Sequence, residues 1–159
     1  MADNGKEHRG NDRSEDRITA REYLLSVERM KRMLRNKQRE LEDARLIAYG
    51  GGSLTDYGER VQSSADLHRM ERQVVDIAAL EEKIRQDIER YLWYRDDVID
   101  TVLSVRNSAQ SMVLYSRYID GDRLEDIAHY MKYNYNHVKK LHWKGVKAVS
   151  RILDERKKS

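Results

Sequence analysis

The chain has 159 residues, of which 39% are apolar and 37% are charged, and its net charge is only +3. This composition excludes a large globular core, and the absence of proline leaves nothing to break long helices. Cysteine is absent as well, which excludes a disulfide framework and any thiolate metal site. No run of residues alternates apolar and polar positions with β-branched enrichment, so an all-α fold is predicted.

Residues 1–17 are polar, charged and glycine-containing, and we expect them to form a disordered tail. This N-terminal stretch contains no apolar run, so the sequence predicts neither a secretory signal nor a membrane-spanning segment. A chain without cysteine also fits a reducing compartment, and a cytoplasmic location is expected.

A first long helix is predicted to begin after Thr19, because Thr19 and Glu22 have the spacing of a capping box. Its seam positions, at alternating spacings of four and three, are Tyr23, Val27, Met30, Leu34, Lys37, Leu41, Ala44 and Ala48. All of these except Lys37 are apolar, which is typical of a coiled coil. Three glycines at 50–52 are expected to end this helix within a glycine-rich loop over 49–63.

A second long helix is predicted from a longer seam of the same kind. Its positions are Leu67, Met70, Val74, Ile77, Glu81, Ile84, Ile88, Tyr91, Arg95, Val98, Val102 and Val105. Such a narrow apolar stripe needs a partner. We therefore predict that residues 18–106 form an antiparallel coiled-coil hairpin that also self-associates, with a dimer favoured. A fully intramolecular three-helix arrangement is the alternative. Asp96 and Asp97 are expected on a solvated face of this helix.

Residues 107–159 are predicted to form a small C-terminal domain of three helices. We expect these helices at 109–119, 124–131 and 135–153, with Ser108 and Asn134 as N-caps of the first and third. The first should stop at Asp120-Gly121. A short turn over 132–134 separates the other two, which is the layout of a helix-turn-helix.

The last predicted helix has an inner and an outer face. Val138 and Leu141 should point into a core with Ile127 and Met131, and the small Ala128 should lie where the helices approach. The outer face carries the candidate DNA-binding residues, which are Tyr135, Asn136, His137, Lys139, Lys140, Lys144 and Lys147. Residues 132–151 contain no Asp or Glu, which is the electrostatic footprint of a phosphate-binding face. In the major groove of double-stranded DNA, Asn can pair with adenine and Lys with guanine or phosphate. The two tryptophans, Trp93 and Trp143, are assigned to packed core positions, and the alternative for Trp143 is to cover a sugar-phosphate edge.

The stretch YSRYIDGDRLEDIAHYMKYNYNHVKKLHWKGV, residues 115–146, resembles region 4 of the sigma-70 factors. It is more similar still to the sigma-region-4-like half of a family of small phage and prophage proteins. Many of that family are described only as a domain of unknown function, and they are similar to regulators of late phage genes. TAREYL at 19–24 and GERVQSS at 58–64 match the same family, so the resemblance covers about residues 18–153.

The resemblance implies a sequence-specific transcription regulator of phage or prophage type that reads the DNA major groove with helix 135–153. The resemblance also suggests RNA polymerase as a further partner. By position, the base-reading residues fall on Asn136, Lys139 and Lys140, with backbone contacts near Tyr135 and His137. Sigma factors usually carry an acidic residue at the position of Asn136, so a promoter −35 element need not be the target. Relatives often carry glycine where this chain has Lys132, and a positive φ there would cost lysine roughly 1 kcal/mol.

Enzymatic activity, a cofactor and a metal site are not expected. The histidines form no HExxH motif, and the glycines at 50–52 lack the Gly-Lys-Ser/Thr of a phosphate-binding loop. Two other binding functions stay open. A phage DNA-packaging protein of the small terminase type also combines a helix-turn-helix with oligomerising helices, and a ring of subunits would favour it over transcription. The hairpin could instead be a protein-binding scaffold. Binding that persists at high salt would favour this alternative.

Overall fold

The computed structural model describes residues 19–50 and 64–159, and every regular element in these ranges is helical. The all-α prediction is therefore confirmed for these residues. The expected tail over 1–17 and most of the expected loop over 49–63 lie outside the described residues. The elements are two long helices, α1 (Ala20–Tyr49) and α2 (Ser64–Leu103), then α3 (Ser108–Tyr115), the π-helical turn η1 (Ser116–Asp120), α4 (Leu124–Met131) and α5 (Tyr135–Lys158).

Local chemistry determines where α1 begins and ends. The Thr19 hydroxyl accepts the Glu22 N–H at 3.2 Å, and the Thr19 N–H donates to the Glu22 carboxylate at 3.0 Å, so the predicted capping box is confirmed. At the other end, the Gly50 N–H donates to the Leu46 carbonyl oxygen at 2.7 Å. A Cβ at Gly50 would lie 2.5 Å from that same oxygen, so a side chain here would collide with the helix it ends.

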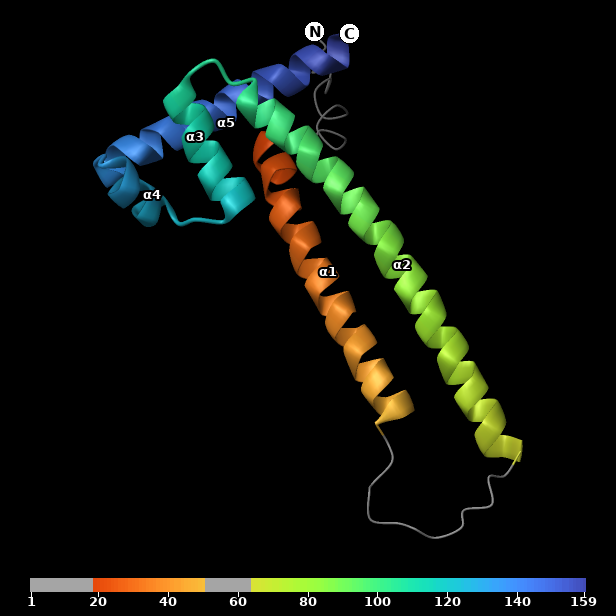
Figure 1. Ribbon diagram of the computed structural model, residues 1–159. Helices are drawn as coiled ribbons and strands as arrows, with labels where there is room; N and C mark the ends of the chain where they lie inside the picture. Colours follow the sequence, from red (N-terminus) through yellow and green to blue (C-terminus); the bar gives the residue numbers. More distant parts are fainter. Residues whose placement is uncertain (1–18, 51–63) are drawn as a thin grey trace, which may run out of the picture.

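The helices α1 and α2 lie side by side and run in opposite directions (Figure 1). Three polar pairs set their register along the length of the contact. They join Tyr23 to Asp97, Lys37 to Asp87, and Arg45 to Glu81. Lys37 and Glu81 are charged residues in the two predicted apolar seams, and each pairs with an oppositely charged residue on the neighbouring helix.

The two seams are buried to different extents. On α1, Tyr23, Leu34 and Leu41 are buried as predicted. On α2, the apolar seam positions from Ile77 onward are buried or partly buried, whereas the earlier seam positions remain exposed. Leu67, Met70 and Val74 are 47%, 45% and 47% exposed, respectively.

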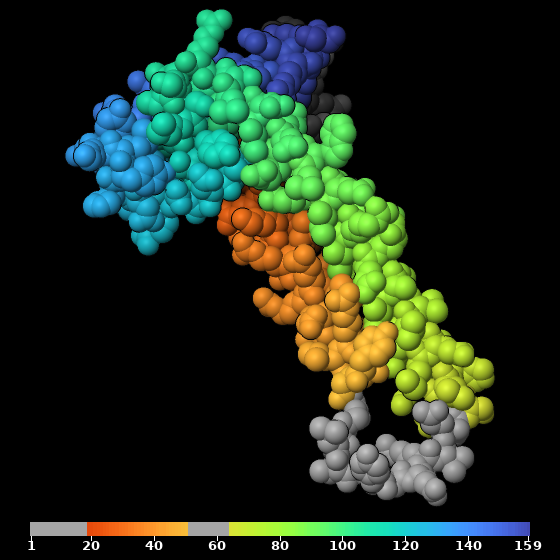
Figure 2. All heavy atoms as spheres, viewed as in Figure 1, coloured from red at the N-terminus to blue at the C-terminus, as the bar shows by residue number. Residues whose placement is uncertain are grey.

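The helices from α3 to α5 form a head at one end of the long helices (Figures 1 and 2). One apolar cluster joins the head to the long helices without interruption. It contains Ala20, Tyr23, Leu24, Val27, Val98, Val102 and Val105 from the long helices and their end, and Leu114, Tyr118, Ile119, Val146 and Val149 from the head. The head therefore covers the apolar surface at that end of α1 and α2.

Asp97 ties three helices together at the junction of head and long helices. Its carboxylate accepts the Tyr23 hydroxyl from α1 and lies 3.2 Å from the Arg156 guanidinium of α5. Burial, together with the hydrogen bond to Asp97, raises the pKa of Tyr23 to about 12. Asp97 is exposed, in keeping with the solvated face expected for it, but its contacts with Tyr23 and Arg156 were not predicted.

Three local predictions for the C-terminal region are also corrected. The N-cap of α3 is Asn107 rather than Ser108, because the Asn107 side chain accepts the Gln110 N–H at 3.0 Å. The helix expected over 109–119 changes from α to π geometry after Tyr115, and Gly121 ends it with a φ of 86°. The helix expected to end near residue 153 continues to Lys158, since its last residues include no breaker and place cations at the C-terminus.

Both tryptophans are exposed, although both were assigned to the core. Trp93 is 82% exposed and Trp143 is 52% exposed. Trp93 lies nine residues from both Ile84 and Val102, which at about 100° per residue places it opposite the seam of α2. Position relative to the seam, rather than the average burial of tryptophan, decides where these side chains lie. Within the described residues, no helix combines the length and the apolar composition needed to cross a membrane.

Candidate nucleic-acid interface

A tight turn connects α4 to α5. Lys132 has left-handed backbone angles, with φ 56° and ψ 38°. This is the position where relatives often carry glycine, and its φ is positive. The Tyr133 N–H donates to the Ala128 carbonyl oxygen at 3.0 Å, which gives this carbonyl in the last turn of α4 a hydrogen-bond partner. Asn134 then caps α5, because its side chain accepts the Asn136 N–H at 2.8 Å, as predicted.

A second apolar cluster sets the angle between α4 and α5. It consists of Val113, Ile127, Ala128, Val138 and Leu141, with Ala109, Leu124 and Met131 packed against it. The inner face predicted for α5 is therefore confirmed, and so is its contact with α4. α3 supplies the third side of this cluster.

Another close contact fixes α5 against α3 further along. A Cβ at Gly145 would lie 3.0 Å from the Leu114 side chain, so the glycine allows the two helices to approach closely. Next to it, His142 Nε2 and the Tyr118 hydroxyl are 2.8 Å apart in a buried hydrogen bond. Burial, aided by Arg117 and Arg21, lowers the pKa of His142. A neutral imidazole thus helps to hold α5 in place.

All seven candidate residues on α5 are exposed. They are Tyr135, Asn136, His137, Lys139, Lys140, Lys144 and Lys147. No ion pair with a carboxylate involves any of these lysines within the described residues. The helix contains no acidic residue before Asp154. Its outer face is therefore cationic over most of its length.

The seven residues do not form one compact site. At about 100° per residue, Asn136, Lys140 and Lys147 lie along one central line of α5. Tyr135 and Lys139 lie on one flank, where the Lys139 ammonium is 5.5 Å from the centre of the Tyr135 ring. His137 and Lys144 lie on the other flank, and the His137 ring meets the Tyr133 ring edge-on with a centroid distance of 5.0 Å.

Trp143 belongs to the same central line, and we did not place it there from the sequence. Its spacing of three from Lys140 and four from Lys147 was the available signal. The indole is half exposed and meets the buried His142 ring edge-on at 5.7 Å. An aromatic side chain therefore lies in the middle of the cationic face.

A second acid-free run, residues 29–39 on α1, was also not singled out from the sequence. Part of its charge is already partnered, since Arg32 lies 3.2 Å from Glu28 and Lys37 pairs with Asp87. Other cations of this run line a recess of about 220 Å³ that also contains Asp120. This run is thus less available to an anion than the outer face of α5.

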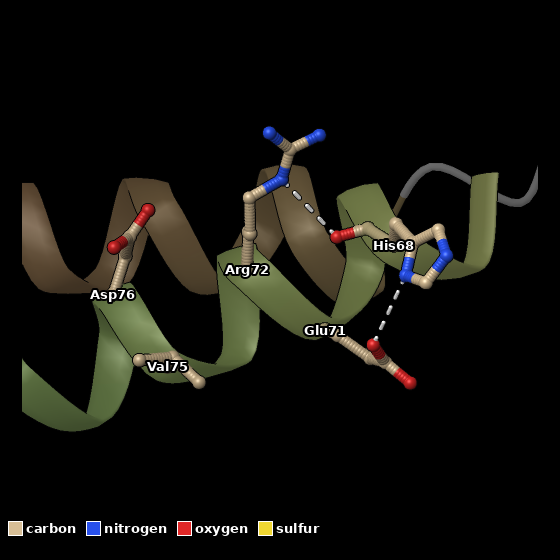
Figure 3. A pocket seen from close by; sticks show the side chains of 5 residues that line it. All are labelled: His68, Glu71, Arg72, Val75 and Asp76. Atoms are coloured by element: carbon tan, nitrogen blue, oxygen red, sulfur yellow. Dashed lines mark hydrogen bonds and ion pairs between the residues drawn. The ribbon is translucent and has the colours of Figure 1, made fainter. Parts of the chain in front are cut away.

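A depression of about 630 Å³ lies near the start of α2, far from α5 (Figure 3). Its lining residues, His68, Glu71, Arg72, Val75 and Asp76, all come from this one helix. His68 Nδ1 lies 3.5 Å from Glu71, and the Arg72 Nε donates to the His68 carbonyl at 3.3 Å. The depression is an open face of a single helix, and His68, Glu71 and Arg72 interact with one another there.

Comparisons with models of known protein families, with curated proteins and with solved structures found no match.

Proposed function

We propose that this chain binds double-stranded DNA through α5 and acts as a transcription regulator of the phage or prophage type. In this proposal α1 and α2 form an antiparallel coiled-coil hairpin, and α4, the turn over 132–134 and α5 form a helix-turn-helix. The chain acts by binding rather than by catalysis. The observation that carries the proposal is the outer face of α5 over residues 135–153, which is exposed, free of acidic residues and packed from behind against an apolar cluster.

The first two turns of α5 would read bases in the major groove. Asn136 can make paired hydrogen bonds with adenine, and Lys140 can donate to guanine. Lys139 and Lys144 lie on the two flanks, where a groove wall presents phosphates. Lys147 lies about 16 Å along the helix from Asn136, at 1.5 Å per residue. That distance suits a contact with the sugar-phosphate backbone rather than with a base.

Self-association belongs to the same proposal. Leu67, Met70 and Val74 continue the apolar seam of α2, but they are nearly half exposed. A second copy that covers these residues would give a dimer. Its two reading helices would then contact half-sites about one helical turn apart, roughly 34 Å, or a multiple of that distance. RNA polymerase is a further partner under this proposal.

Two alternatives are distinguished by measurements on the same protein. A DNA-packaging protein of the small terminase type would form a ring, so light scattering on the complete chain separates it from a dimer. A protein-binding scaffold would keep its binding at high salt, whereas binding through phosphate contacts weakens steeply as salt rises.

The decisive experiment selects preferred duplexes from a random DNA library and then compares variants on the selected and scrambled sequences. Asn136→Ala should relax discrimination at one base position by about 1–3 kcal/mol. Lys147→Ala should weaken binding to both duplexes alike and lower the salt slope by about one. Arg35→Ala, in the other acid-free run, is the matched control for loss of a surface cation.

Equal effects of Asn136→Ala and Lys147→Ala on every sequence would contradict the assigned roles. An unchanged affinity in Lys139→Ala/Lys140→Ala would contradict DNA binding through α5 altogether. Loss of binding in Arg35→Ala, with no loss in the α5 variants, would move the interface to α1.

A further inference from the structure

The outer face of α2 carries apolar side chains that serve neither the fold nor the proposed DNA interface. Trp93 is 82% exposed, and Leu92 and Leu103 on the same side are 46% and 62% exposed. Single exposed leucines are ordinary, but tryptophan is highly buried on average. A tryptophan presented to solvent beside two leucines is therefore an informative feature of a surface.

Leu92 and Trp93 lie in a shallow groove of about 540 Å³, and Leu103 lies beyond its end. The residues that line it are Glu89, Leu92, Trp93, Asp96, Asp97 and Asp100. Their spacings of three and four place them in one strip along α2. Because Trp93 lies opposite the seam, α1 cannot cover this strip.

The rim of the groove is acidic. Glu89 is partly neutralised by Arg85 at 2.7 Å, and Asp96 has only a long contact of 3.9 Å with Arg95. The Asp100 carboxylate has no ion pair with any described residue. No lysine or arginine is among the lining residues. The groove thus combines an aromatic centre with a negative border, which is the opposite charge to the outer face of α5.

We propose that this groove docks a basic amphipathic segment of a partner protein. A lysine or arginine of the segment lies over the Trp93 ring, where the electron-rich face of the indole attracts a cation. Apolar side chains of the segment cover Leu92 and Leu103. Further basic residues pair with Asp96 and Asp100 at the rim, where opposite charge steers association and excludes acidic competitors.

The groove and the DNA interface can be occupied at the same time. α5 runs from the reading residues to Arg156, which contacts Asp97 at the edge of the groove. Asn136 and Arg156 are twenty positions apart on this helix, which corresponds to about 30 Å. DNA itself is repelled by the acidic rim, so the groove does not extend the DNA interface. A bound partner is therefore held beside the DNA rather than in competition with it.

The test uses the full-length Trp143→Phe variant, in which Trp93 is the only fluorophore of its kind. The probe is a synthetic amphipathic helix of leucine and lysine, and the control probe is the same helix with glutamate in place of lysine. Titration with the basic helix should give a saturable blue shift of the Trp93 emission. The acidic helix should give none.

Variants then assign the binding to the groove, with fluorescently labelled probe and anisotropy as the readout. Trp93→Ala should weaken binding of the basic helix about 30-fold, the size expected for an interface hot spot. Asp96→Asn should weaken it about two- to fivefold, as for one exposed charge pair. Leu46→Ala, an exposed apolar residue elsewhere on the long helices, should leave the affinity unchanged. The circular dichroism and thermal unfolding of Trp93→Ala should match those of the unsubstituted chain, which shows that this variant is folded.

Three outcomes would overturn the proposal. The first is equal affinity for the basic and acidic helices, and the second is binding that Trp93→Ala does not weaken. The third is a blue shift of Trp93 that depends only on the concentration of the protein itself, because a second copy would then cover the groove. None of these outcomes depends on whether α5 binds DNA.

Discussion

The two long helices are stabilised differently at their two ends. At the head end, Leu24, Val98 and Val102 are completely buried, because helices of the head cover them as a third layer. In the distal shaft, which we define as residues 34–49 and 64–88, a small cluster of Leu41, Ile77 and Ile84 is covered only by neighbouring side chains of α1 and α2. Several apolar residues near the distal end remain exposed.

The same seam pattern thus gives different burial, depending on whether a third element is present. Two helices in contact bury a narrow stripe, and the flanks of that stripe stay open to water. Where the head is absent, polar pairs such as Lys37–Asp87 and Arg45–Glu81 fix the register instead. The head end should therefore contribute most of the free energy of unfolding. The polar pairs of the distal shaft should mainly determine the register of α1 against α2.

The largest expected effect is at the head end. Leu24→Ala removes a fully buried side chain and should lower the free energy of unfolding by about 3 kcal/mol. Leu46→Ala, on an exposed position of the same helix, should change it by less than about 0.5 kcal/mol. Urea unfolding followed by circular dichroism measures both. Similar losses in the two variants would remove the distinction between the two ends.

The next largest effect is expected in the distal shaft. Lys37→Met leaves the carboxylate of Asp87 without the ammonium that holds its pKa below its usual range. Unfolding should become easier, because a poorly exposed carboxylate loses its closest cation and keeps only the contact with Arg90 at 3.5 Å. Lys37→Met/Asp87→Leu should restore the midpoint of thermal unfolding. A double variant as unstable as the single one would show that this pair does more than align the helices.

A smaller effect, of opposite sign, is expected in the head. Lys132→Gly relieves the left-handed backbone at the turn before α5 and should raise the free energy of unfolding by about 1 kcal/mol. Lys132→Ala keeps the Cβ and should gain nothing, so it is the matched control. Hydrogen exchange should slow within α4 and α5 but not in the distal shaft. Uniform slowing would indicate that both regions unfold together.

The smallest effect concerns acidification. Burial lowers the pKa of His142, so the unfolded chain takes up a proton before the folded chain does. Stability contributed by the neutral imidazole is present above pH 6.5 and is lost as the pH falls from there through the lower folded pKa. His142→Gln should reduce the fall in thermal midpoint over this range, whereas His129→Gln, an exposed control, should not. If the thermal midpoint of His142→Gln falls as much on acidification as that of the unsubstituted chain, carboxylates rather than His142 cause the fall.

Local chemistry made most of the fold predictable from the sequence. The capping box at Thr19, the cap at Asn134 and the inner face of α5 depend on neighbouring residues, and all three are confirmed. The burial of α2 was not predictable in the same way, because it depends on where the head folds back. The π-helical turn after Tyr115 left no sign in the spacing of apolar residues.

The candidate interface was predictable as a set of exposed residues, but not as a geometry. Val138 and Leu141 define the inner face of α5. The exposure of the lysines and asparagine on the opposite face could therefore be predicted. Trp143 was misplaced, because residue type was given more weight than helical position. Asp97 is exposed as expected, but its partners Tyr23 and Arg156 could not be predicted, since both are distant in the sequence.

The uninterrupted apolar cluster between head and long helices has a mechanical consequence. Because α5 packs in the same core as α1 and α2, any rotation of α5 carries the long helices with it. α2 has 40 residues, so at 1.5 Å per residue it is a lever of about 60 Å. A turn of the head by about 10° would then sweep the far tip through roughly 10 Å, since displacement is the product of angle and lever length. A spectroscopic label near residue 64 would therefore report the orientation of the head with considerable amplification.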